Sequence, residues 1–344
     1  MVSRALERTG SDRHPPPLTS GVATSIGSLP HRDAHEAAAF VIATHADLPA
    51  APQLPRRSPR ERMVAQSAAG IDGVTVDATG VVRITHALCT EALVASTFDD
   101  GWGGTLAFLD VIAGRRKPVK LQLTGPVTLG LALLHAGADA SVAFRVAGRA
   151  VAARAAALVD LAGSVAPGVP LVVFLDEPGL GAAGHPGFPL PAEHVVDLLA
   201  GSLAAVGPSV TTGVHCCANS GWQLALRASP DVVSLPATAS VTDHAPVLAS
   251  FLESGGWVAW GAVPTSGPVG DEPDPCWRRL VGLWCELMRA GCDAGLLRRQ
   301  ALVTPACGLA EHGVTQAARV LRLTTQIAER VQDQAIASPL SVGA

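Results

Sequence analysis

The sequence predicts an α/β protein in which short buried strands form a parallel sheet and alternate with helices. Short apolar runs that end in Gly, Pro or polar residues recur along the chain, each followed by a longer Ala- and Leu-rich segment with helical spacing. The runs are apolar throughout instead of alternating, which is typical of strands buried on both faces. No internal repeat of fixed period divides the chain.

The elements follow one another in the order that such a sheet requires. Strands are expected at Val22–Ile26, Val119–Leu123, Pro170–Leu175, Val210–Val214, Asp231–Leu235, Trp257–Val263 and Ala301–Thr304. Helices are expected at Ala34–Thr44, Ser141–Ala162, Ala192–Val206, Trp277–Ala290 and Thr315–Ala337. The stretch from Ala50 to Asp110 shows no clear pattern, and we expect it to hold the remaining strand and loops.

Two arrangements of such a sheet are possible, an open doubly wound sheet and a closed barrel. No glycine-rich phosphate-binding motif follows the first strand, so the usual evidence for an open nucleotide-binding sheet is missing. Reactive side chains instead follow strand after strand, as in a barrel whose strand ends converge on one site. These residues are Ser28, Gln122, Thr124, Asp176, Glu177, His215, Cys217 and Cys307. We predict a single-domain (β/α)8 TIM barrel.

Composition sets the limits of this domain. The 344 residues suffice for one barrel or for two ordinary domains. Only 4% of residues are aromatic and Tyr is absent, so Ala, Val and Leu must fill the interior. Residues 1–19 are polar and proline-rich, and we expect a disordered leader there, followed by the barrel over residues 20–338.

Charge and hydropathy argue against several classes of partner. A net charge of −4 is unlike that of a general nucleic-acid binder, which would be basic. No apolar run reaches the roughly 18 residues of a membrane helix, and the run Pro126–Leu134 is stopped by His135 and Asp139. The amino terminus lacks the apolar centre of a signal peptide. We expect a cytoplasmic protein with neither nucleic-acid nor membrane partners.

The seven cysteines favour free thiols or metal ligands over disulfides, because their number is odd and no export signal is present. Residues two apart in a strand face the same side, so His215 and Cys217 can reach one ion while Cys216 faces away. This pair alone is equally compatible with a structural role. Cys307 follows the last strand and would lie nearby in a barrel. Three ligands with an open fourth position make the catalytic type of zinc site.

Two adjacent carboxylates, Asp176 and Glu177, follow the strand Pro170–Leu175. Unpaired buried carboxylates are costly, so this pair is difficult to explain as part of the core. Asp176 is either a cap for the next helix or a carboxylate that holds a substrate ammonium group. We favour the second interpretation.

Five motifs occur in an order that resembles a known family. They are Ser25-Ile26-Gly27-Ser28-Leu29-Pro30, Lys120-Leu121-Gln122-Leu123-Thr124-Gly125-Pro126-Val127-Thr128, Leu175-Asp176-Glu177-Pro178, His215-Cys216-Cys217 and Pro305-Ala306-Cys307-Gly308-Leu309. The sequence is similar to the catalytic carboxyl-terminal domain of cobalamin-independent methionine synthase, in the uroporphyrinogen decarboxylase-like barrel superfamily. The resemblance spans nearly the whole chain after residue 20.

The resemblance implies an S-methyltransferase that converts homocysteine, or a similar small thiol, to methionine with zinc as cofactor. The implied zinc ligands are His215, Cys217 and Cys307. The implied substrate-binding residues are Ile26, Gly27, Ser28, Asp176 and Glu177, with Asp176 as the catalytic carboxylate that binds the amino group. Zinc would convert a thiol with an ordinary pKa of about 8.5 to the thiolate, which attacks a methyl carbon held in line.

The chain departs from the family pattern mainly on the side of the methyl donor. Pro236 stands where the family has a fourth zinc ligand, so water, the substrate sulfur or Glu177 would complete the ion. Ala132 and Ala182 replace a tryptophan and a glutamate that serve folate, and no histidine lies in the stretch from residue 261 to 267. The donor is therefore expected to be a methyl-folate or a methyl-corrinoid protein. We favour the corrinoid, because its cobalt leaves without protonation.

Other readings of the same residues stay open. His31 and His185 would replace the missing acid for a folate amine, although loop positions favour a simpler role for both. A lyase resembling uroporphyrinogen decarboxylase would need no metal but an arginine-rich cleft. A third alternative is a zinc-thiolate binding or sensing protein without turnover.

Overall fold

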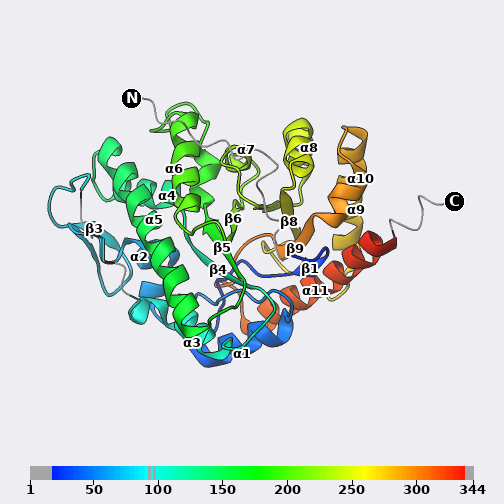
Figure 1. Ribbon diagram of the computed structural model, residues 1–344, viewed down its shortest axis with the longest axis horizontal. Coiled ribbons are helices and arrows are strands. Elements are labelled where there is room, and N and C mark those ends of the chain that lie inside the picture. Colours follow the sequence, from blue (N-terminus) through cyan, green and yellow to red (C-terminus); the bar gives the residue numbers. More distant parts are fainter. Residues whose placement is uncertain (1–17, 92–93, 96–97, 338–344) are drawn as a thin grey trace.

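The computed structural model describes residues 18–91, 94–95 and 98–337. Its centre is a seven-stranded parallel sheet in the order β1-β9-β8-β7-β6-β5-β4. The sheet curls into a half-barrel, and the helices are arranged around its outside (Figure 1). The strands are β1 (Val22–Ala23), β4 (Val119–Thr124), β5 (Leu171–Asp176), β6 (Thr211–His215), β7 (Val232–Pro236), β8 (Trp257–Val263) and β9 (Ala301–Pro305). Of the predicted leader, only Leu18 and Thr19 lie within the described residues. Ser338, the last residue of the predicted barrel domain, lies outside them.

The helices fill the connections between strands. They are α1 (Ala34–Thr44), α2 (Met63–Ala68), α3 (Gly103–Val111), α4 (Pro126–His135), α5 (Ala140–Val165), α6 (Ala192–Ala204), α7 (Trp222–Arg227), α8 (Ala245–Glu253), α9 (Asp274–Arg289), α10 (Ala294–Arg299) and α11 (Val314–Ala337). Short 3₁₀ turns are η1 (Pro59–Glu61), η2 (Asp100–Trp102), η3 (Pro178–Ala182) and η4 (Ala239–His244). In the part of the chain that the structure describes, no helix has the length and apolar character needed to cross a membrane.

The predicted α/β order and parallel pairing are confirmed, and all seven predicted strands lie in this one sheet. The first is shorter than predicted, because after Ala23 only Thr24 still donates its amide to β9, at 3.0 Å from the Val303 carbonyl oxygen. Helix α4 was missed. It begins with Pro126 directly after β4, and burial on nearly every side removes the polar face by which a helix is recognised.

The stretch from Ala50 to Asp110 does not supply a regular eighth strand among the described residues. Its strands β2 (Val74–Val76) and β3 (Val82–Ile84) form a separate antiparallel hairpin. The segment 50–53 instead makes single parallel bridges on both sides, Ala50 to Lys120 of β4 and Gln53 to Ser28. Pro49, directly before this segment, and Pro52, within it, have no N–H, so a continuous ladder cannot form. A complete (β/α)8 barrel stays a prediction.

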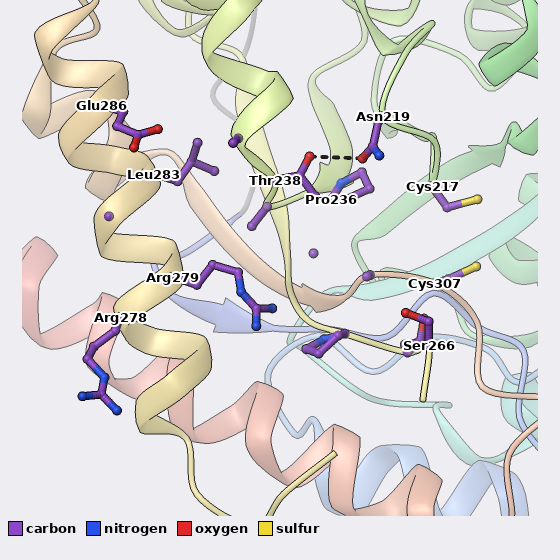
Figure 2. A pocket seen from close by; sticks show the side chains of 17 residues that line it. Cys217, Asn219, Pro236, Thr238, Ser266, Arg278, Arg279, Leu283, Glu286 and Cys307 are labelled. Atoms are coloured by element: carbon purple, nitrogen blue, oxygen red, sulfur yellow. Dashed lines mark hydrogen bonds between the residues drawn. The ribbon is translucent and has the colours of Figure 1, made fainter. Parts of the chain in front are cut away.

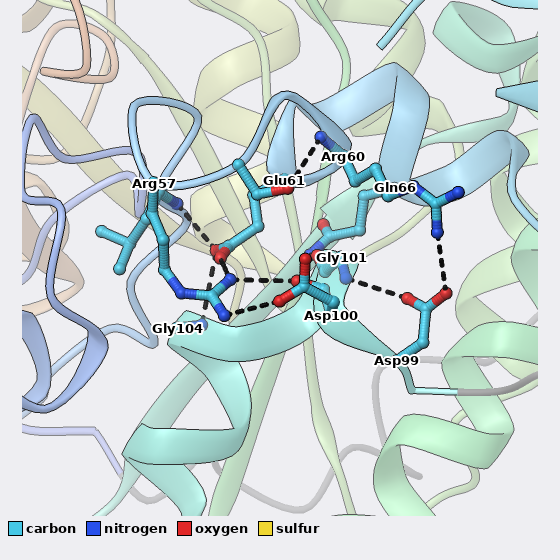
Figure 3. A network of polar contacts seen from close by, with 10 residues as sticks. Arg57, Arg60, Glu61, Gln66, Asp99, Asp100, Gly101 and Gly104 are labelled. Carbon is cyan, nitrogen blue, oxygen red and sulfur yellow. Dashed lines mark hydrogen bonds and ion pairs between the residues drawn. The ribbon is translucent and has the colours of Figure 1, made fainter. Parts of the chain in front are cut away.

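An ion-pair network around the buried carboxylate of Glu61 holds the loop between this segment and α2 (Figure 3). The carboxylate of Glu61 accepts hydrogen bonds from Arg57, at 2.5 Å, and from the Leu54 and Gly104 amides, at 3.0 and 3.3 Å. Arg57 also pairs with Asp100 at 2.6 Å. The loop is thereby fixed against the start of α3.

The interior of the curled sheet has its own small apolar cluster. Its buried residues are Leu48, Val172, Phe174, Val232, Ala259 and Leu302. Most of the remaining core lies between the sheet and the surrounding helices. Side chains alternate along a strand, so residues two beyond the members of the inner cluster face the same interior, nearer the carboxyl ends of the strands.

Candidate active site

Strand register places Asp176 and His215 side by side in the interior of the half-barrel. Phe174 of β5 pairs with Gly213 of β6, and Asp176 pairs with His215. A Cβ at Gly213 would lie 2.4 Å from the Phe174 ring, so Gly213 faces the interior beside that ring. Asp176 and His215 follow two residues later on the same face, at the carboxyl ends of their strands.

The structure brings together the three residues that the sequence predicts as metal ligands. The ligand atoms of His215, Cys217 and Cys307 all lie within 4.8 Å of one another. Tetrahedral zinc holds two thiolates about 3.8 Å apart, given bonds of about 2.3 Å, so a contraction of about 1 Å at most brings the group to zinc geometry. Cys216 faces the other way and is fully buried in the outer core, as the strand alternation predicts.

Ser234 of β7 orients the histidine of this group. Its hydroxyl lies 2.9 Å from His215 Nδ1, which leaves the buried Nε2 with no hydrogen-bond partner among the described residues. Metal-bound histidines are commonly fixed in this way through the second ring nitrogen. The residues present therefore fit a metal such as zinc. Ser234 was not predicted, because its contact depends on the register between β6 and β7.

The two cysteines differ in acidity. Contacts with Cys217 and then with His215 hold the pKa of Cys307 well below that of an ordinary thiol. The pKa of Cys217 is raised by the same contact and by burial. The lowered pKa favours the thiolate form of Cys307, and the thiolate is the form that binds a metal.

Asp176 is a buried carboxylate with an unused acceptor. Its Oδ1 has no hydrogen-bond partner among the described residues. Burial raises the pKa of Asp176, and the charges of Lys120 and His215 oppose that shift. An orphaned acceptor beside the three ligand residues is suited to a substrate ammonium group.

Lys120 of β4 is a buried cation that belongs to one of the five motifs, but no role was predicted for it. Its Nζ donates to the Ile26 carbonyl oxygen, at 2.7 Å, and to Gln122 Oε1, at 3.2 Å, and lies 4.8 Å from the centre of the Phe174 ring. Burial lowers its pKa to about 8, with the Asp176 charge opposing. A lysine inside a strand that the sequence pattern predicts to be buried was the available signal. Lys120 ties β4 to the segment predicted to hold homocysteine.

That segment, Ile26 to Ser28, adjoins the turn that carries Cys307. Gly27 has φ +135°, and a Cβ there would lie 2.4 Å from Gln122 Nε2, so the position requires glycine. The Ser28 carbonyl oxygen accepts from the amide of Leu309 at 2.8 Å. The predicted substrate segment and the predicted metal ligand are thus joined directly.

Glu177 lies against α4 and outside the three-residue group. Its carboxylate accepts from the amides of Val127 and Thr128, both at 2.8 Å, and from the Thr128 hydroxyl at 2.6 Å. A Cβ at Gly125 would lie 2.3 Å from Glu177 Cδ, so this glycine makes room for the carboxylate. Burial raises the pKa of Glu177 to about 7. Its substrate contact and its use as a fourth ligand stay predictions.

A cavity of about 780 Å³ adjoins the group on the side of Cys217 and Cys307 (Figure 2). Pro236 lines it, and none of its described lining residues is a histidine. His31 packs against Phe40 with ring centres 4.8 Å apart, and His185 is exposed, so neither borders this cavity.

Comparison with known proteins gives a likeness of fold. No model of a known family matches the sequence, and no protein with a curated description matches it. The structure is similar to a B12-independent methionine synthase from Shewanella sp. W3-18-1, with a TM-score of 0.59 and 14% identity over 92% of this chain and 99% of that one. Another similar structure is that of a Listeria monocytogenes protein proposed to be a vitamin-B12-independent methionine synthase. Its TM-score is 0.55, with 14% identity over 87% of this chain and 86% of that one. What is shared is the fold.

Proposed function

We propose that this protein is a zinc-dependent S-methyltransferase that transfers a methyl group to the thiol of homocysteine and so forms methionine. The observation that carries the proposal is the meeting of His215, Cys217 and Cys307 within 4.8 Å, beside Asp176, whose Oδ1 has no hydrogen-bond partner in the described part of the chain. The fold of the Shewanella methionine synthase, whose structure is a complex with selenomethionine, an analogue of methionine, supports the same activity.

In this proposal the zinc ligands are His215, Cys217 and Cys307, with Ser234 fixing the histidine ring. Zinc, when bound, would favour the thiolate form of a substrate sulfur at neutral pH. Asp176 accepts hydrogen bonds from the homocysteine ammonium group. The segment from Ile26 to Ser28 holds the rest of the amino acid, and Lys120 positions that segment through the Ile26 carbonyl.

Methyl transfer forms a sulfur–carbon bond while the bond from carbon to the donor breaks and its electron pair leaves with the donor. A methyl-folate amine needs a proton to leave well, and the described lining of the cavity contains no histidine to supply it. A corrinoid cobalt accepts the electron pair without a proton. We therefore favour a methyl-corrinoid donor over a methyl-folate, with the reaction in the cytoplasm.

We also propose that segment 50–53 takes the place of the eighth strand and closes the half-barrel. Its bridges to β4 and to Ser28, on opposite sides, support this closure. The closed interior would exclude water around Asp176.

Metal analysis tests the zinc site. We expect about one zinc per chain in the wild type, and loss of most of it in Cys307→Ser and His215→Ala, because each change removes one of three ligands. Cys285→Ser, at a half-buried thiol on α9, is the matched control and should keep its zinc. Correctly folded wild-type protein that contains no zinc would overturn the proposal.

An activity assay separates enzyme from sensor. Zinc-loaded protein supplied with homocysteine and a methyl donor should form methionine. If homocysteine changes the spectrum of the cobalt-substituted protein but no donor yields methionine, a zinc-thiolate sensor is the better description. A decarboxylase resembling the uroporphyrinogen enzyme would be active without the metal.

A further inference from the structure

The cavity beside the two cysteines is distinct from the place proposed for homocysteine. Cys217 and Cys307 line it, whereas neither Asp176 nor the segment from Ile26 to Ser28 does. The two cysteines therefore lie between the cavity and the proposed homocysteine site. In-line transfer places the sulfur, the methyl carbon and the leaving atom of the donor on one line, so the donor extends away from the sulfur. The cavity beside the cysteines is placed to admit this second substrate.

One wall of the cavity is a charged stripe on α9. Arg279, Leu283 and Glu286 lie four and three residues apart, which puts them on one helix face, and all three line the cavity (Figure 2). Arg279 extends into it and has no hydrogen bond or ion pair among the described residues. Glu286 lies seven residues after Arg279, which is about 10 Å along the helix axis. The guanidinium is thus without a carboxylate partner of its own.

The other walls are neutral. Near the cysteines the lining is formed by Pro236, Gly261 and Ala306, and polar groups such as Thr238 and Asn219, hydrogen-bonded at 3.1 Å, lie further along. The volume of about 780 Å³ is in the range of small-ligand sites. This lining suits a molecule with an apolar, reactive end at the cysteines and an anionic end at α9.

We propose that the cavity binds the methyl donor through an anionic group, a phosphate or a carboxylate, held by Arg279. Guanidinium groups bind both anions through paired hydrogen bonds. This inference rests on the proposed methyl transfer, and it specifies a donor that carries a charge remote from the methyl group.

Direct binding tests the anion site without any turnover. Inorganic pyrophosphate is titrated calorimetrically into zinc-loaded wild type, Arg279→Gln and Arg289→Gln. Arg289 ends the same helix, is exposed and does not line the cavity, so its change is the matched control. We expect Arg279→Gln to weaken binding about tenfold, the value typical of one charge-assisted contact, and Arg289→Gln to leave it unchanged. Absent binding, or equal binding by wild type and Arg279→Gln, overturns the inference.

Donor kinetics distinguish the two sources of the anion. Methylcobalamin carries a phosphate that methylcobinamide lacks, and methyl-tetrahydrofolate is compared with one or three glutamates. If Arg279 binds a phosphate, Arg279→Gln should raise the KM for methylcobalamin but not for methylcobinamide. If it binds a carboxylate, the KM for the triglutamate form of methyl-tetrahydrofolate should rise more than that for the monoglutamate form. An equal effect on methylcobinamide, or an effect on homocysteine instead, overturns the inference. If wild type forms no methionine with any donor, the proposed function fails and the pyrophosphate titration alone decides the anion site.

Discussion

At the scale of residues, the site is characterised by ionisable side chains that are buried in the protein interior. Asp176 and Lys120 are both buried, and each opposes the effect of burial on the pKa of the other. Lys120 has hydrogen-bond partners, whereas Asp176 Oδ1 has none among the described residues. An unpaired buried acceptor costs stability. A substrate ammonium group would remove that cost, which is the physical basis of the binding role proposed for Asp176.

Replacing Asp176 by Asn tests this role. The amide keeps the size of the side chain but loses the charge, so the KM for homocysteine should rise about tenfold or more. The zinc content should be unchanged and kcat should change little, because the ammonium is held in both the ground state and the transition state. Steady-state kinetics with metal analysis measure both. Asp160→Asn, on the exposed face of α5, is the control, and an unaltered KM in Asp176→Asn would contradict the assignment.

At the scale of elements, Glu177 connects β5 to the start of α4. A helix leaves its first amide groups without partners, and Glu177 accepts from two of them, those of Val127 and Thr128. This contact fixes α4 above the carboxyl ends of β4 and β5. Burial nevertheless makes the charged form of Glu177 unfavourable and raises its pKa from 4.5 to about 7.

This shift predicts a pH-dependent stability. A carboxyl whose folded-state pKa is raised contributes stability that is fully present below its unfolded pKa, 4.5, and is lost as the pH rises through about 7. Wild type should therefore lose about 3 kcal/mol in the free energy of unfolding across this window relative to Glu177→Gln. Urea unfolding at several pH values measures the difference. Glu329→Gln, on an exposed face of α11, is the control. The prediction would be refuted if the difference in the free energy of unfolding between wild type and Glu177→Gln did not change with pH.

At the scale of the whole molecule, segment 50–53 lies between the two edges of the curled sheet. The Ala51 amide donates to the Lys120 carbonyl at 2.8 Å, and the Gln53 amide donates to the Gly27 carbonyl at 3.0 Å. One short segment thus makes backbone hydrogen bonds to the edge strand β4 and to the segment that follows the other edge strand, β1. Only global unfolding should expose such amides if the barrel is closed.

Hydrogen exchange tests the closure. The amides of Ala51 and Gln53 should exchange as slowly as those of β4 and β5. The amides of Thr79 and Val81, at the exposed tip of the β2–β3 hairpin, provide the fast-exchanging reference. Exchange of Ala51 and Gln53 at the rate of this hairpin tip would show that the half-barrel opens along segment 50–53.

The sequence by itself determined what depends on neighbours along the chain. Burial on both faces predicted the parallel strands, and the two-residue alternation placed His215 and Cys217 on one side and Cys216 on the other, because side-chain direction in a strand is a local property. The position of Cys307 after the last strand predicted its proximity to that pair. These local patterns were sufficient for the order of the fold and for the three-residue group, whose use as a zinc site stays a prediction.

Only the tertiary structure decided what depends on contacts between distant segments. Strand register paired Ser234 with His215, the packing of α4 turned Glu177 away from the three ligand residues, and the position of α9 brought Arg279 to the cavity. No spacing in the chain encodes these contacts. Each arises where two surfaces meet, and the free energy of that packing is a sum over residues that are far apart in the sequence.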